Sequence, residues 1–557
     1  MPTNEPTIAD YVQRVGRKLL ATEGPAIAPL PANERARGVR ARAGTSYWRY
    51  ERAAYRFILR HEAGIQRLLV VLLGIASWGL IALPFALGRQ APAIPVVLAL
   101  LYQVYWLGRG LGTLVYGGVG CLRVRVHRRI DWRARYEAER AAGGAALPWK
   151  KIRHIVVISN YSEPVAKLRA TLEALAAQRE VASQLWVVLA MEGREEGAAA
   201  KARALQAEFA GRLGDLRYTL HPAGLPGEVP GKAANEAWAA RWARRHYVDE
   251  LGHDIHRITL TSCDVDSVFD PGYFACLTYK FATDPARQRR IWQAPVFFHN
   301  NAWQVPTFIR FLGLSLAVWQ LADLTSPLGD PHPISTYSIS LATLDGAGYW
   351  DPGIVTEDWH IYFKCFFRYR GRISIEPIYL PVSADATLST SLARTATVRY
   401  EQAKRHGWGT GELLFGAVKM AFRHAEIPAH VKMPPVLMLA REHILWSTSW
   451  FVLTLGLSVP AVLNPGFFAA GLGLSLQRLY ALLGAAMTAL SPALPIIDLL
   501  LGPPRPQERR WWQTAWAALQ WWLMPFITLI FAVLPILDAQ TRLLLGQRLA
   551  YRVTEKV

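Results

Sequence analysis

The chain has 557 residues, of which 52% are hydrophobic and 21 are tryptophans, and its net charge is +20. Several apolar stretches near both ends reach the length of about 20 residues with which a helix crosses a bilayer. The basic residues crowd beside these stretches, as in the cytosolic loops of membrane proteins, which argues against nucleic acid as a partner and predicts a multipass membrane protein.

The N-terminal segment, residues 1–64, is polar, rich in arginine and dotted with proline and glycine. We predict a basic cytosolic arm, disordered in part. The first apolar run begins only near Leu68, so no signal peptide is expected and the protein is inserted into the membrane. The 4 cysteines form no C-x-x-C pair, which indicates a reducing compartment without a disulfide framework or a zinc ribbon.

Two transmembrane helices are predicted in residues 65–120, at Leu68–Leu87 and Ile94–Val115. Residues 431–557 form a C-terminal transmembrane region with three further candidates, Ile444–Leu463, Phe467–Leu490 and Trp521–Leu537. An odd total conflicts with the basic C-terminal tail, which favours the cytosol. Either Ser491–Leu501 adds a crossing or a re-entrant loop, or one candidate lies in the interface.

The middle of the chain, residues 121–430, begins with a basic linker that is expected to hold the domain against the inner leaflet. Short β-rich runs then alternate with helical ones, which predicts an α/β domain with a mostly parallel sheet. The predicted strands are His154–Ile158, Leu185–Leu189, Leu216–Leu220, Ile258–Ser262 and Ile291–Gln293, and the helices are Pro164–Ala177, Ala198–Phe209, Gly231–Arg244 and Pro271–Ala282. No G-x-G-x-x-G or P-loop motif follows the first strand, so dinucleotide and P-loop chemistry are not indicated.

Two amphipathic stretches, Trp303–Leu324 and Gly411–Phe422, are interrupted by polar residues. We therefore expect them to lie at the membrane surface without crossing it. These interfacial helices would then cover the side of the cytosolic domain that faces the membrane.

Two carboxylates, Asp264 and Asp266, follow the Ile258–Ser262 strand. Ligands of open parallel sheets bind outside the carboxyl ends of the strands. A D-x-D sequence there offers oxygen ligands for a divalent ion shared with a substrate's phosphates. Alone, such a pair is also compatible with a solvated turn.

Two polar motifs precede the D-x-D. The first strand ends in Ser159-Asn160-Tyr161-Ser162-Glu163, which can hold a base and a ribose or serve only as a helix N-cap. Further on, Gly231-Lys232-Ala233-Ala234-Asn235 places a lysine at the start of a helix, where amides and an ammonium can meet a diphosphate. A solvated lysine is the alternative.

Two more motifs follow it. Thr356-Glu357-Asp358 is at the start of a predicted helix. Carboxylates there are often only stabilised by the helix dipole, but one can also act as a general base on an incoming hydroxyl. Gln402-Ala403-Lys404-Arg405-His406-Gly407-Trp408 offers an amide, a cation for a leaving diphosphate and an indole face for a sugar.

The ordered series S-N-Y-S-E, G-K-A-A-N, D-V-D, T-E-D and Q-x-x-R resembles the membrane-embedded family 2 glycosyltransferases, relatives of the cellulose, chitin and hyaluronan synthases. The resemblance covers residues 150–425 and implies an inverting enzyme with a GT-A fold. It implies a nucleotide-diphosphate sugar as donor, taken here as a UDP-sugar, Mg²⁺ or Mn²⁺ as cofactor, and the cell (inner or plasma) membrane as location. The Val553-Thr554-Glu555-Lys556 tail also resembles one seen in these enzymes.

The same resemblance implies roles for individual residues. Asn160, Glu163 and Glu192 would lie at the base and ribose, Lys232 near the diphosphate, and Asp264 at the nucleotide and the metal. Asp266 would ligate the metal, and Asp358 with its neighbour Glu357 would be catalytic. Gln402, Arg405 and Trp408 would cover the diphosphate and the acceptor end.

Two departures from the family pattern leave the product open. The second strand offers Glu192 where the family has an aspartate, and Trp408 stands two positions beyond its place in Q-x-x-R-W. Trp408 could serve as a platform for a growing polysaccharide only if a loop through His406 and Gly407 folds back. The alternatives are transfer of one sugar to a lipid or polyprenyl-phosphate acceptor, and a non-catalytic membrane scaffold or transporter.

A polymer would also need a polar pathway through the membrane. The candidates in the apolar stretches are Gln103, Tyr105, Arg109, Gln477 and Gln520, each of which could equally be an interhelical hydrogen-bond partner.

Overall fold

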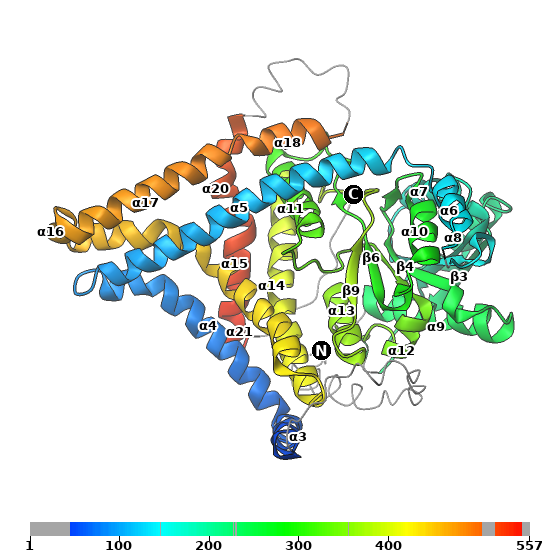
Figure 1. The fold of residues 1–557 in the computed structure, drawn as a ribbon, viewed down its shortest axis with the longest axis horizontal. Coiled ribbons are helices and arrows are strands. Elements are labelled where there is room, and N and C mark those ends of the chain that lie inside the picture. The colour runs from blue at the N-terminus through cyan, green and yellow to red at the C-terminus, as the bar shows by residue number, and fades with distance from the viewer. Residues whose placement is uncertain are drawn as a thin grey trace.

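The computed structural model describes residues 45–547 except 145, 227, 229–230, 355 and 504–518. The predicted N-terminal arm up to residue 44, the basic run at 505–510 and the Val553–Lys556 tail lie outside the described residues. Figure 1 shows two parts, a domain built on a β-sheet and a set of long helices that extend away from it.

A seven-stranded sheet with the order β3-β2-β1-β4-β8-β6-β9 forms the centre of the α/β domain. Its strands are β1 (Arg153–Asn160), β2 (Leu185–Glu192), β3 (Asp215–His221), β4 (Ile258–Asp264), β6 (Arg290–Gln293), β8 (Tyr337–Ser340) and β9 (Ser374–Pro377). All neighbours are parallel except that β8 runs antiparallel to both β4 and β6. This mixed sheet confirms the predicted α/β fold class with a mostly parallel sheet, and each strand predicted from the sequence is present.

Helices cover both faces of this sheet, and alternate residues of each strand point to opposite faces. Ile155 and Val157 of β1 belong to a core that includes α9 (Lys232–Arg244), whereas Val156 and Ile158 belong to a second core. The second core includes α7 (Val165–Ala176), α8 (Ala198–Glu208) and α10 (Tyr273–Thr283). Strands buried on both faces explain why β1 and β2 are continuous apolar runs.

The first of these cores continues into the long helices. It also contains Leu413 of α14 (Leu392–Arg423) and Leu439 of α15 (Ala429–Leu463). The remaining helices of the domain are α6 (Trp132–Ala141), α12 (Leu341–Ala347) and α13 (Glu357–Arg368). A small sheet of β5 (Val268–Phe269), β10 (Val382–Ser383) and β7 (Val296–Phe297) lies beside them.

Five helical segments within the described residues are long and apolar enough to cross a membrane. They are α4 (Glu62–Leu87), α5 (Ala93–His127), α11 (Thr307–Thr325), α15 and the Trp521–Leu544 segment. The last segment contains α20 (Met524–Thr528) and α21 (Leu534–Leu544), joined through Leu529–Val533. Helix α5 outruns its predicted end at Val115, so the predicted domain boundary after residue 120 falls inside a helix.

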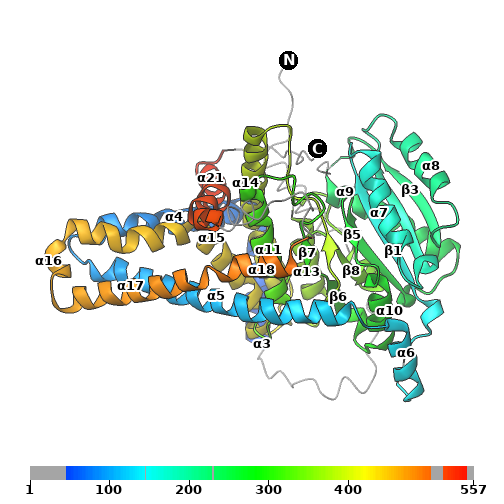
Figure 2. The same ribbon diagram turned by 90° about the horizontal axis from the view of Figure 1, so that it is seen from above.

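The predicted crossing at Phe467–Leu490 is divided between α16 (Pro465–Phe468) and α17 (Gly471–Leu490). Helix α17 is not one of the five candidate spans found in the described residues. It is long enough, but the polar residues Gln477 and Arg478 interrupt its apolar sequence. It packs along α5, and α18 (Ala493–Leu501) also contacts α5 (Figure 2). Residues 493–501 therefore form a short helix that contacts α5.

Helix α11 covers most of the Trp303–Leu324 stretch that was predicted to lie in the interface, and two of its polar side chains, Gln320 and Asp323, turn toward protein. The Oε1 atom of Gln320 accepts a hydrogen bond from the Val296 amide of β7 at 2.8 Å. Asp323 lies 3.9 Å from Arg109 of α5. The polarity of this stretch thus reflects contacts with the domain and with α5, and α11 has the length and composition of a membrane span.

The predicted basic linker, Arg123–Arg135, is helical in two parts, at the end of α5 and in α6. Some of its arginines bind the domain itself. Arg123 donates to the Tyr379 hydroxyl at 2.6 Å, and Arg128 lies 2.8 Å from Asp270. These contacts attach the domain to α5 directly.

Candidate active site

The D-V-D motif lies at the point where the order of the sheet strands reverses. Strand β1 has β2 on one side and β4 on the other, and Ser159 is paired with both Ala190 and Asp264. The polar end of β1 and the carboxylates after β4 therefore lie at the same edge of the sheet, where open α/β sheets bind ligands.

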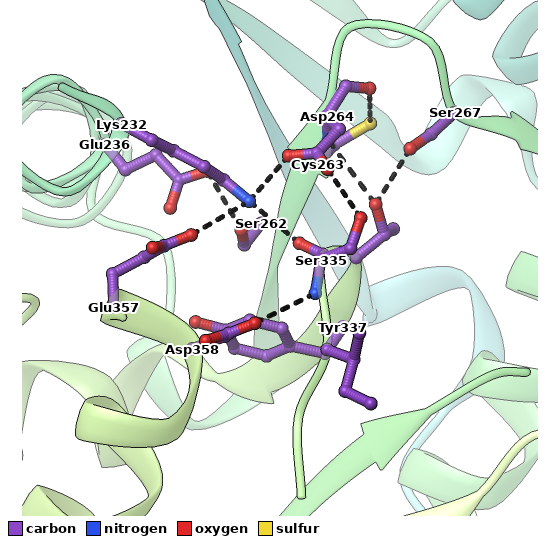
Figure 3. A network of polar contacts seen from close by, with 12 residues as sticks. Lys232, Glu236, Ser262, Cys263, Asp264, Ser267, Ser335, Tyr337, Glu357 and Asp358 are labelled. Atoms are coloured by element: carbon purple, nitrogen blue, oxygen red, sulfur yellow. Dashed lines mark hydrogen bonds and ion pairs between the residues drawn. The ribbon is translucent and has the colours of Figure 1, made fainter. Parts of the chain in front are cut away.

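Lys232 joins three of the sequence motifs (Figure 3). Its ammonium lies 2.6 Å from Asp264 and 3.3 Å from Glu357. It also donates to the Ser335 carbonyl oxygen at 2.9 Å. Burial lowers the pKa of Lys232, but the neighbouring carboxylates outweigh burial and hold that pKa well above its usual value. The G-K-A-A-N, D-V-D and T-E-D motifs thus meet around one cation.

The start of α9 places this lysine. Small residues let the helix lie close to the sheet, and Ala233, Ala237 and Ala240 are all buried. Asn235 donates from Nδ2 to the Ala190 carbonyl oxygen of β2 at 2.6 Å. The asparagine of the motif therefore positions the helix, and the lysine one turn earlier reaches the edge of the sheet.

Ser335 connects the D-V-D and T-E-D motifs. Its hydroxyl donates to Asp264, and its amide donates to Asp358 Oδ2 at 3.2 Å. Ser335 has φ +59°, a left-handed conformation that side chains with a Cβ adopt at a cost. The surrounding sequence, P-I-S-T-Y at residues 333–337, contains no motif that points to Ser335, because the role of Ser335 depends on its backbone conformation.

Asp358 is a carboxyl group with a raised pKa. Burial, followed by the neighbouring Glu357 carboxylate, raises the pKa of Asp358 to about 7. The Trp359 amide donates to Asp358 Oδ1 at 2.8 Å, which fixes the carboxylate at the start of α13. A base with a pKa near the working pH combines the correct protonation state with a useful driving force.

Glu236 is a fourth carboxyl group of the cluster, and the sequence motifs did not indicate it. It stands one turn after Lys232 on α9, is fully buried, and accepts a hydrogen bond from the Ser262 hydroxyl at 2.8 Å. Burial raises the pKa of Glu236 to about 8 against the opposing effect of Lys232. An i,i+4 pair of Lys and Glu could have suggested the contact but not its burial.

The predicted metal ligands differ in accessibility. The Asp264 side chain is 28% exposed and already binds a cation, the Lys232 ammonium. Asp266 is 4% exposed, and its Oδ2 atom accepts a hydrogen bond from the Asp385 amide at 3.2 Å. Within the described ranges no group of three or more His, Cys, Asp or Glu side chains could hold a metal. A divalent ion shared with a diphosphate needs only one or two carboxylates, which this pair supplies, with Asp264 the more accessible.

The residues predicted to hold the base and ribose form a second group. Asn160 donates from Nδ2 to Glu195 at 2.9 Å, and the Ser162 amide donates to the same carboxylate at 3.0 Å. Glu163 accepts from the Tyr161 amide at 2.6 Å. Glu195 was not predicted as a site residue. It lies in the loop after β2 and is the acidic residue that contacts Asn160.

Glu192, which was predicted to contact the nucleotide base, is buried at the end of β2 and contacts basic side chains. It lies 3.2 Å from Arg194 and 3.7 Å from His221. Although burial lowers the pKa of His221, the neighbouring Glu192 and Glu228 carboxylates raise it to about 9, and Glu228 is hydrogen-bonded to it at 2.8 Å. Glu192 is therefore engaged with basic side chains of its own loop and of β3.

The Q-x-x-R motif lies within α14, which is one continuous helix. The expectation of a loop folding back through His406 and Gly407 is therefore wrong, because the two glycines allow close packing instead. A Cβ at Gly407 would lie 3.1 Å from the Cα of Ile536, and one at Gly409 would lie 2.4 Å from Thr356.

The predicted residues of that motif follow one another along α14. Gln402 accepts hydrogen bonds from Thr387 at 3.1 Å and from Arg399 at 3.0 Å. Arg405 and Trp408 are half-buried on the following turns. Because Gly409 lies against Thr356, this part of α14 lies next to the T-E-D motif.

No protein-family model matches the chain, and no curated protein gives a significant match. Among solved structures, the chain is similar to the mannosyltransferase PcManGT from Pyrobaculum calidifontis in complex with GDP-Man and Mn²⁺, with a TM-score of 0.38 and 16% identity over 76% of this chain and 98% of that one. It is also similar to a fragment of TarS from S. aureus in complex with UDP-GlcNAc, with a TM-score of 0.32 and 12% identity over 71% and 93% of the two chains. GalNAc-T7 with UDP, GalNAc and Mn²⁺ has a TM-score of 0.29 and 12% identity over 54% and 56%. These likenesses are distant, and the chemistry of this chain rests on its own side chains.

Proposed function

We propose that the chain is a membrane glycosyltransferase that transfers a sugar from a nucleotide-diphosphate sugar, a UDP-sugar, to an acceptor hydroxyl with inversion. The observation that carries this proposal is the cluster around Lys232, in which Asp264 and Glu357 share one ammonium. Ser335 links the same Asp264 to Asp358. A cation, a D-x-D carboxylate and a base with a raised pKa are the groups that such a transfer requires.

The donor would lie along the carboxyl edge of the sheet. Its base and ribose would contact Asn160, Glu163 and the Glu192 region, and its diphosphate would contact Lys232 at the start of α9. Gln402 and Arg405 on α14 would cover the diphosphate from the other side. Asp264 and Asp266 would hold Mg²⁺ or Mn²⁺, which neutralises negative charge on a leaving diphosphate when it is bound.

Asp358 would take the proton of the acceptor hydroxyl. The acceptor oxygen then forms a bond to the anomeric carbon from the face opposite the diphosphate, whose bond to that carbon breaks. The result is a sugar of inverted configuration and a free nucleotide diphosphate. Glu357 supports the base, because its negative charge is one cause of the raised pKa of Asp358.

A growing polysaccharide is the acceptor that we favour. Trp408 is half-buried on α14, one residue before Gly409, which packs against Thr356, so the acceptor end would lie along this part of the helix and not on a folded-back loop. One observation favours the alternative, transfer of a single sugar to a lipid or polyprenyl phosphate. Gln103, a candidate pathway residue, donates to the Tyr480 carbonyl oxygen at 3.2 Å and so connects two helices.

We place the α/β domain in the cytosol and the long helices in the cell membrane. The four cysteines are all free and buried, as suits a reducing compartment. The basic residues beside the apolar helices support the same orientation.

The test is release of nucleotide diphosphate from a panel of sugar nucleotides by the purified protein in detergent, with product mass recorded. We expect one donor to be consumed and the Asp358→Asn variant to be nearly inactive. A protein that hydrolyses and transfers none of the donors would be the scaffold or transporter of the alternative reading.

A further inference from the structure

The Lys232 ammonium has three N–H protons but four oxygen neighbours. Two carboxylates and the Ser335 carbonyl oxygen lie within 3.3 Å. The fourth neighbour, Glu236 Oε1, lies 3.8 Å away, beyond a hydrogen bond but within reach of a small side-chain movement. Figure 3 shows the ammonium between Asp264 and Glu357, with Glu236 beside it on the same helix.

Glu236 is an unusual neighbour because, among the described residues, one hydrogen bond and one cation at 3.8 Å are the polar contacts of a fully buried carboxyl group. Its side chain is fully buried, and Ser262 supplies a hydrogen bond to Oε1 only. Its Oε2 atom is buried and has no hydrogen-bond partner within the part of the chain that the structure describes. Buried polar atoms are nearly always paired, so the Glu236 carboxyl group has capacity for a further hydrogen-bond partner in another state of the site.

A divalent ion at Asp264 would create that state. The Lys232 ammonium and a divalent ion compete for the Asp264 carboxylate, because two positive charges at such distances repel each other. Lysine carries its charge on a flexible four-carbon chain, whereas Glu236 is held by α9 and by its bond to Ser262. The ammonium can therefore move while Glu236 stays.

We propose that Glu236 is a positioning residue that receives the Lys232 ammonium when a divalent ion takes Asp264. This inference rests on the proposed function, in which Asp264 binds Mg²⁺ or Mn²⁺. Lys232 competes with the ion for Asp264, and Glu236 relieves that competition by offering a second acceptor. The lysine stays in the site, next to the place of the diphosphate. A carboxyl oxygen of Glu236 accepts this hydrogen bond whether or not the group is ionised.

Binding of Mn²⁺ to the full-length protein in detergent, without donor, tests the proposal through the electron paramagnetic resonance signal of free Mn²⁺. Removing the competing cation with Lys232→Gln should tighten Mn²⁺ binding about tenfold, a typical coupling between contacting residues. Glu236→Leu, which removes the second acceptor, should weaken Mn²⁺ binding about fivefold. Asp264→Asn should weaken it most, which locates the ion.

The decisive variant is Lys232→Gln combined with Glu236→Leu. If Glu236 acts only through Lys232, the double variant should bind Mn²⁺ as tightly as Lys232→Gln alone. The conservative Glu236→Gln, which keeps an oxygen acceptor, should stay within about twofold of the wild type.

Three results would overturn the inference. They are an unchanged affinity in Lys232→Gln, a Glu236→Leu effect of the same size with and without Lys232, and no Mn²⁺ binding in either the wild type or Lys232→Gln. Since the measurement involves neither donor nor acceptor, a failure of sugar transfer would leave these outcomes unaffected. Lys232→Gln and Glu236→Gln keep the test informative if Glu236→Leu does not fold.

Discussion

Gly409 on α14 lies directly against Thr356, the first residue of T-E-D: a Cβ at position 409 would come within 2.4 Å of Thr356 Cγ2. Helix α14 also packs against α21 of the last candidate span. The position of the proposed base, two residues after Thr356, therefore depends on the packing of a helix that contacts the membrane segment.

This contact predicts that Gly409→Ala lowers turnover. The added methyl group must displace Thr356 and with it the start of α13, and a misplacement of about 1 Å can cost 10²-fold in rate. Donor affinity should fall less than turnover, because Lys232 lies on α9 and the donor residues of α14, Arg405 and Gln402, lie one and two turns before position 409. The matched control is Gly416→Ala on the same helix, where a Cβ meets nothing within 4 Å. Equal rates for the two variants in a nucleotide-diphosphate release assay would contradict the prediction.

Asp358→Asn separates binding from chemistry. The amide keeps the shape of the side chain but cannot accept the acceptor's proton, so kcat should fall by about 10² to 10⁴. Donor affinity, measured by calorimetry, should stay near that of the wild type. A collapse of donor affinity would instead assign Asp358 to the donor site.

The pH profile should report the same residue. Because the pKa of Asp358 is raised to about 7, the fraction able to accept a proton falls as the pH drops below that value. The rate should therefore decline on the acid side of about pH 7. Glu357→Gln removes a charge that raises this pKa, so the acid limb should move to lower pH even if the maximal rate falls. An acid limb that stays in place in Glu357→Gln would show that another group controls it.

Chelation tests the metal assignment. EDTA should abolish the activity of the wild type, and added Mg²⁺ or Mn²⁺ should restore it. The Asp266→Asn variant, which lacks a charged oxygen ligand, should need a higher metal concentration for the same rate. Asp284→Asn is a suitable control, because Asp284 pairs with Arg290 at 2.8 Å in another part of the domain. Full activity in EDTA would exclude a required divalent ion.

Substitutions of Ser335 test the strain at the site. A left-handed residue with a Cβ costs about 1–2 kcal/mol, while glycine adds about 0.4–1 kcal/mol of unfolded-state entropy. Both Ser335→Gly and Ser335→Ala lose the hydrogen bond to Asp264, so their difference isolates the backbone. We expect the glycine variant to be more stable by about 0.5–1 kcal/mol in thermal unfolding. An alanine variant of equal stability would mean that the backbone relaxes at position 335.

Much of the fold follows from local patterns in the sequence. Apolar runs such as β1 and β2, broken by polar strand ends, predicted the order of strands and helices, because burial on both faces requires such runs. The motifs at Lys232, Asp264 and Asp358 were likewise visible, since strand ends and helix starts carry recognisable residues. The sequence also predicted α4, α5 and α15, because their apolar length is itself the signal.

Only the tertiary structure decided which of these groups meet. Glu236 and Ser335 carry no motif, and they join the site because α9 packs on the sheet and the backbone turns before β8. Gly407 and Gly409 have low helix propensity and suggested a loop, yet α14 continues through them because close packing against Ile536 and Thr356 requires residues without side chains. Local preference is worth about 1 kcal/mol for a glycine, so contacts between distant segments override it.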